Sequence, residues 1–133
     1  MEERRHNFTT TVLWTTVLYY AACGISAIFY PKSWLWVSGL PLEVSNELGL
    51  AFGVAGVYLL TMAFAATISA VSPHQHRGLI LTLAVGNILD FAVTLKAVVA
   101  HSLPFLNGAL FIVVTVAFAL LLSMAYIKTR LHP

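Results

Sequence analysis

Charged side chains are scarce in this sequence of 133 residues. Asp, Glu, Lys and Arg together make up 9% of the chain, and hydrophobic residues make up 59%. A soluble domain is usually about 25% charged, so too few charges are present to cover a surface that faces water. We therefore expect lipid to surround most of the chain. The net charge is only +2 and no basic run is present, which argues against nucleic acid as a partner.

Residues that hold metals or carry out covalent catalysis are also rare. Cys23 is the only cysteine, which excludes an internal disulfide and a cysteine zinc site. No histidine lies inside an expected membrane span, which argues against a haem held by two histidines of this chain. No spacing of carboxylates and histidines marks a metal site, and no nucleophile–base pair is evident. We expect neither a metal nor a cofactor.

Long apolar segments, in contrast, occupy most of the chain. A hydrocarbon core of about 30 Å needs about 20 mainly apolar residues to be crossed by a helix. Four segments meet this length, at about residues 10–30, 47–71, 79–100 and 104–127. They predict an all-α membrane protein, a four-transmembrane-helix bundle in a single membrane domain of residues 1–133. The longest connection, residues 31–46, contains two tryptophans that suit the headgroup layer, so we expect it to lie in the interface.

Basic residues near the spans indicate an orientation. Five of them fall on one side of a membrane that is crossed four times, namely Arg4, Arg5, Arg77, Lys128 and Arg130. Only Lys32 and Lys96 belong to the other side. The positive-inside rule then places both termini in the cytoplasm. We expect an integral, multi-pass protein of the plasma or inner membrane rather than of an organelle.

The second span contains the stretch "GLAFGVAG". Gly49, Gly53 and Gly56 lie on one face of the expected helix, and Ala63 continues that face. Membrane helices associate through close backbone approach and a few polar contacts, and small residues permit both. We expect another helix to pack along this row. No internal repeat is visible, so the sequence does not support an inverted-repeat transporter.

The third span carries a polar stripe centred on Asp90. At about 100° per residue, Asn87, Thr94 and His101 lie on the same face as Asp90, whereas Lys96 points about 120° away. Two tyrosines of the other spans should lie at a similar depth. The candidate polar cluster is therefore Tyr20, Tyr58, Asn87, Asp90, Thr94 and His101. Such a stripe should face protein rather than lipid.

Asp90 has two interpretations. A charge at the centre of the bilayer costs about 2.5–3.5 kcal/mol, so we expect a neutral or strongly hydrogen-bonded acid. The structural interpretation is a polar clamp between helices, worth about 0.6 kcal/mol on average. The functional interpretation makes Asp90 the candidate catalytic residue, a proton relay or a ligand contact.

The order of features resembles that of the small DoxX-like four-helix membrane proteins. The first span ends in "FYP", an interfacial segment follows, and the second span is glycine-rich, "NELGLAFGVAGVYLL". By architecture the resemblance covers most of the chain. Some members of that group are associated with quinone-linked oxidoreductase complexes, so the resemblance implies an accessory role. It transfers no catalytic residue to this sequence.

Two hypotheses about function follow, and they belong to different classes. The first is a non-catalytic accessory or assembly subunit of a membrane complex, because no catalytic constellation is visible. The second is a small membrane enzyme or binding protein for a lipidic molecule of the quinone or isoprenoid class, with Asp90, Asn87 and Tyr58 lining the site. Besides the lipid bilayer, the candidate partners are a larger membrane complex, a second copy of the chain and a lipidic ligand. Proton-coupled transport has less support, because one acid and no repeat make a poor transport core.

Overall fold

The computed structural model describes residues 2–131, and side-chain positions within residues 8–130. This part of the chain forms five helices and no strand. They are α1 (Glu2–Phe29), α2 (Pro31–Ser38), α3 (Asn46–Val71), α4 (Arg77–Val99) and α5 (Phe105–Leu131). All but the short α2 are long and apolar enough to cross a membrane. The predicted all-α class and its four membrane-spanning candidates are confirmed.

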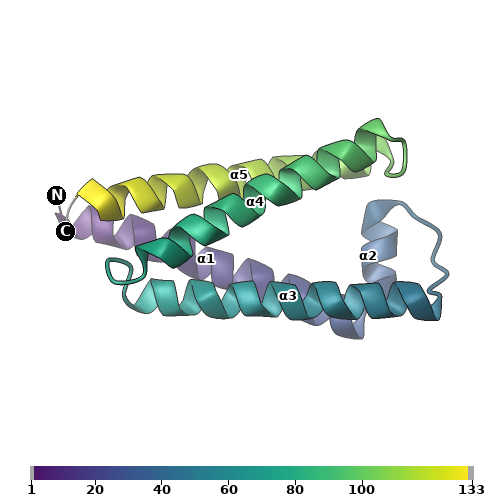
Figure 1. Ribbon diagram of the computed structural model, residues 1–133, viewed down its shortest axis with the longest axis horizontal. Coiled ribbons are helices and arrows are strands. Elements are labelled where there is room, and N and C mark those ends of the chain that lie inside the picture. The colour runs from purple at the N-terminus through teal and green to yellow at the C-terminus, as the bar shows by residue number, and fades with distance from the viewer. Residues whose placement is uncertain (1, 132–133) are drawn as a thin grey trace.

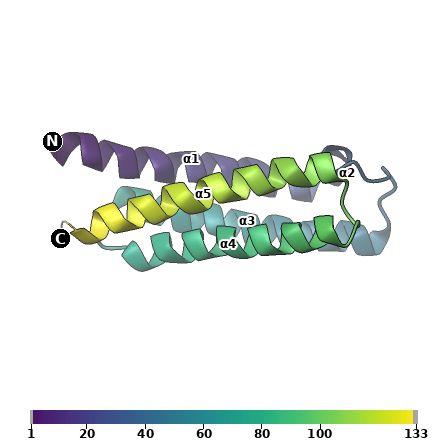
Figure 2. The ribbon, with the colours of Figure 1, turned by 90° about the horizontal axis from the view of Figure 1, so that it is seen from above.

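The long helices are arranged as two antiparallel pairs. Helix α1 packs along α3, and α4 packs along α5, whereas the contacts between the pairs are much fewer. The pairs lie close together where α1 begins and α5 ends, and they diverge toward the opposite end, where α2 stands between them (Figure 1). Seen from above, the four long helices run along one common axis (Figure 2). We call the two ends of the molecule the terminal end and the α2 end.

Glycine permits a very close approach of α1 to α3. A β-carbon added at Gly56 would lie 2.8 Å from the carbonyl oxygen of Gly24, and one added at Gly24 would lie 3.0 Å from that of Gly56. A larger residue at either position would push the helices apart. Four further small residues of α3 are buried toward the terminal end, namely Ala63, Ala66, Ser69 and Ala70.

The expected glycine row of α3 is therefore used only in part. Gly56 lies at the contact with α1, as the pattern predicts. A β-carbon at Gly53 would meet nothing within 4 Å, and one at Gly49 would meet only Val44 of the preceding connection. The row continues along α3 through buried alanines rather than toward its first glycines, because α1 crosses α3 at Gly56.

The hydrophobic core lies toward the terminal end and joins the two pairs there. Each long helix contributes to it, and its fully buried members are Leu13, Ala66, Ile80, Leu83, Leu122 and Ala125. At the same end, the ammonium group of Lys128 on α5 lies 3.7 Å from the centroid of the Phe8 ring on α1. Such a cation–π contact stabilises a partly dry site by about 0.5–2 kcal/mol. The core and this contact thus hold the pairs together at the terminal end.

The α1–α3 contact yields a test with a matched control. Gly56→Ala should lower the free energy of unfolding by about 1–3 kcal/mol, because the added methyl group would overlap the backbone of α1. Gly53→Ala lies on the same helix and faces open space, so it should be neutral or stabilising by up to about 1 kcal/mol through helix propensity. Unfolding of both variants in detergent would measure the difference, and equal stabilities would contradict the packing described.

Candidate functional site

Helix α2 bridges the two helix pairs at their open end. The indole Nε1 of Trp34 donates a hydrogen bond to Ser26 Oγ of α1 at 3.0 Å. On the other side, Asn107 Nδ2 of α5 donates to the carbonyl oxygen of Val37 at 2.6 Å. The short helix is therefore fixed to α1 and to α5 through hydrogen bonds of side chains. Its own residue Leu35 is buried.

The turn that ends α2 depends on a glycine. Gly39 has a φ of 68°, in the left-handed region that glycine adopts without strain. A β-carbon there would also lie 2.9 Å from Oδ1 of Asn107, the residue that binds α2 to α5. The glycine thus lets the chain leave α2 sharply while passing close to α5.

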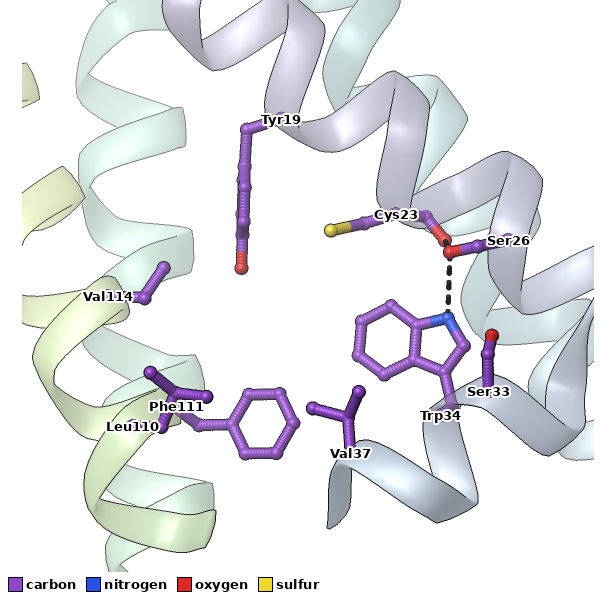
Figure 3. Close-up of a pocket in the computed structure, with 9 residues that line it drawn as sticks. All are labelled: Tyr19, Cys23, Ser26, Ser33, Trp34, Val37, Leu110, Phe111 and Val114. Carbon is purple, nitrogen blue, oxygen red and sulfur yellow. Dashed lines mark hydrogen bonds between the residues drawn. The ribbon is translucent and has the colours of Figure 1, made fainter.

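A cavity of about 270 Å³ lies between α1, α2 and α5. Each of the three helices contributes lining residues, and Figure 3 shows all nine of them: Tyr19, Cys23, Ser26, Ser33, Trp34, Val37, Leu110, Phe111 and Val114. At its inner end the Tyr19 ring stacks on Phe118 of α5, with 4.7 Å between the ring centroids. The cavity therefore begins where α1 and α5 separate.

The cavity wall is mainly apolar, with a few polar atoms supplied by α1 and α2. The hydroxyl groups of Ser26 and Ser33 already donate hydrogen bonds to backbone carbonyl oxygens of Cys23 and Tyr30. The Tyr19 hydroxyl and the Cys23 sulfur, one helical turn apart, are directed into the cavity (Figure 3). None of the described residues that line it is Asp, Glu, Lys, Arg or His. This environment suits a neutral molecule that is mostly apolar.

Two residues of the predicted polar cluster are joined directly. Asn87 Nδ2 of α4 donates to the Tyr20 hydroxyl of α1 at 2.7 Å and also to the carbonyl oxygen of Leu83 at 2.9 Å. The side chains of Tyr20 and Asn87 are only 3% and 1% exposed. This pair connects the two helix pairs near the middle of their length.

Asp90 lies one turn farther toward the α2 end and is half-buried. Among the placed side chains of residues 8–130, none donates a hydrogen bond to its carboxylate. Thr94, which shares the stripe, donates to the backbone carbonyl oxygen of Asp90 at 2.8 Å instead. The described part of the chain therefore supplies no side-chain donor to this acid.

The other two predicted residues lie at the margin of the cluster. The Tyr58 side chain is 44% exposed, and its hydroxyl would lie 3.5 Å from a β-carbon added at Gly86 of α4. His101 lies in the turn after α4, exposed, with a φ of 55°. Because it follows the end of the helix, it is outside the group around Asp90. In the described part of the chain no three His, Cys, Asp or Glu residues are placed to hold a metal ion.

The cavity residues are the part of the site that the sequence did not indicate. Tyr19, Trp34 and Phe111 come from three different helices, and only the tertiary arrangement brings them together. The sequence contains one weak indication of this second site. Tyr19 precedes Tyr20, and helical geometry directs adjacent side chains to different faces. The pair "YY" could therefore serve two sites at the same depth.

Comparisons with known proteins give no match: no family model fits the chain, and neither a curated protein nor a solved structure is significantly similar to it.

Proposed function

We propose that this small membrane protein binds a lipidic molecule in the cavity between α1, α2 and α5. The cavity itself carries the proposal. Its volume of about 270 Å³ lies just below the range of roughly 300–1,000 Å³ that is common for ligand sites. It accommodates one ring or a short length of chain, so that the remainder of a longer quinone or isoprenoid would extend into the bilayer.

The position of the cavity supports access from the membrane. It lies within the apolar segments Phe8–Phe29 and Phe105–Arg130, which are long enough to span a bilayer. Helices α1 and α5 meet at Tyr19 and Phe118, and beyond this contact they diverge toward the α2 end. A hydrophobic molecule would reach the cavity sideways between these two helices, without crossing water.

A second candidate function is that of an accessory subunit of a membrane complex, as the resemblance to DoxX-like proteins implies. Asp90 supports this proposal, because an acid at mid-membrane depth is costly unless something pairs with it. Within residues 8–130 no side chain donates to its carboxylate, and the nearby Tyr58 ring is 44% exposed. A partner helix that supplies a donor here would lower that cost.

We also propose that both termini lie in the cytoplasm. The described ends of α1 and α5 lie at the same end of the molecule (Figure 1). That end also carries Arg77, Lys128 and Arg130, and the excess of basic residues supports a cytoplasmic position.

The binding proposal is tested through Cys23, the only cysteine of the chain. N-ethylmaleimide should react with Cys23 in membranes only while the cavity is empty. Farnesol or decylubiquinone, present at about ten times its Kd, should therefore slow this reaction about tenfold. Val114→Trp should fill the cavity and lower the labelling without any probe. Val113→Trp, on the exposed face of α5, is the control. Labelling that neither probe slows would refute the proposal.

The accessory role predicts a stoichiometric larger partner after extraction in mild detergent. Asp90→Leu should weaken that association about threefold or more, since polar contacts between membrane helices contribute about 0.6 kcal/mol on average and up to about 1.7. Asp90→Asn retains the shape and an acceptor, so it should weaken the association less. Val93→Leu, an exposed apolar position on the same helix, is the control. Purification of the wild-type chain alone would count against this role.

The orientation is tested with single cysteines in a Cys23→Ser background. Gln75→Cys lies in the exposed turn between α3 and α4, and Glu43→Cys lies in the exposed connection after α2. A membrane-impermeant maleimide added to intact cells should label the cysteine at position 43 and reach position 75 only after permeabilisation. The reverse pattern would show that the termini lie on the other side.

A further inference from the structure

Two parallel aromatic rings from different helices line the cavity. The rings of Trp34 on α2 and Phe111 on α5 are parallel to within 7°, and their centroids are 6.2 Å apart. Figure 3 shows both rings face-on and side by side. We call these two rings the aromatic platform. A planar molecule can stack on these rings, whereas a flexible chain cannot make a comparable contact.

The platform is held in place before any ligand arrives. The hydrogen bond from Trp34 to Ser26 fixes the indole ring to α1, and the bond from Asn107 to Val37 fixes α2 to α5. Rigid binding groups lose little conformational freedom when a ligand binds, so their contacts contribute more fully to affinity. The two rings can therefore discriminate by shape.

A hydroxyl group directed into the same cavity supplies a polar contact. The Tyr19 ring is seen edge-on in Figure 3, and its hydroxyl points into the cavity. Its position is fixed by neighbouring rings, Tyr20 with centroids 5.6 Å apart and Phe118 with centroids 4.7 Å apart. A phenol hydroxyl can donate one hydrogen bond and can also accept one, so it suits either a carbonyl or a hydroxyl oxygen.

The charges around the cavity favour a neutral ligand. No Lys, Arg or His is among the described residues that line it, so a carboxylate or phosphate would find no cation. Burying an unpaired charge in an apolar site costs far more than burying a neutral polar group that keeps one hydrogen bond.

We infer that the cavity selects neutral, flat ring compounds that carry one hydroxyl or carbonyl oxygen, with the ring on the aromatic platform and the oxygen near Tyr19. This inference rests on the proposed binding function and specifies the class of ligand. The rest of the molecule can be any hydrophobic group, because it lies outside the cavity.

Three probes separate the features of this ligand class: 2-naphthol, 1-decanol and 2-naphthoate. The first two have the same number of carbons and one hydroxyl group but differ in flatness, and the third keeps the ring but adds a charge. Each would be titrated against the labelling of Cys23 in nanodiscs, with partition measured in protein-free nanodiscs. Half-protection should require roughly two- to tenfold less 2-naphthol than 1-decanol, the range expected for an aromatic contact. 2-Naphthoate should not protect.

Variants of the platform test the position of the ring. Trp34→Leu and Phe111→Leu should each raise the half-protecting concentration of 2-naphthol roughly two- to tenfold and leave that of 1-decanol unchanged. Phe111→Leu tests the platform without altering the hydrogen bond between Trp34 and Ser26. Trp36→Leu is the control, because Trp36 belongs to the same helix but is 73% exposed. Tyr19→Phe should raise the half-protecting concentrations of 2-naphthol and 1-decanol by the same factor.

The outcomes distinguish this inference from the binding proposal. If 1-decanol protects as well as 2-naphthol, selection for a ring is overturned while binding in the cavity stands. Unchanged protection by 2-naphthol in both platform variants overturns the position of the ring, and protection by 2-naphthoate overturns the preference for a neutral ligand. If none of these probes, farnesol or decylubiquinone protects Cys23, the binding proposal itself fails.

Discussion

The arrangement depends on where the helix backbones can approach each other closely. In a bilayer the lipid tails are as apolar as the side chains, so helices are held together by close packing and a few polar contacts. Gly24 and Gly56 permit this between α1 and α3, and Gly108 permits it between α4 and α5, where a β-carbon would overlap Val98. No comparable glycine contact joins the pairs in the described part of the chain. They meet through their core at the terminal end and diverge beyond it.

The divergence of the two helix pairs creates a space that helix α2 partly fills. A non-helical segment between membrane helices would leave backbone groups without partners, whereas a short helix satisfies most of its own. Proline at its first turn and Gly39 at its end define its length. Trp34 and Asn107 then connect it to α1 and α5, which gives the open end a rigid bridge and leaves a cavity beneath it.

Local properties of the chain could be predicted from the sequence, and its non-local contacts could not. Hydropathy indicated the spans because each long helix is apolar along most of its length, and helical periodicity placed Asn87 on the face that meets Tyr20. The pattern could not show that α1 crosses α3 at Gly56 rather than at Gly53, since both positions lie on one face. It also could not reveal the aromatic platform, because Trp34 and Phe111 are distant in sequence and only the fold brings them together.

The polar cluster and the cavity are two consequences of the same divergence. Asn87 lies where the pairs are still close, so its amide reaches Tyr20 across the interface. Asp90 lies one turn farther along α4, where the helices have begun to separate, and no described side chain donates to it. The same separation of the pairs thus leaves both an acid without a described side-chain donor and a cavity beneath α2.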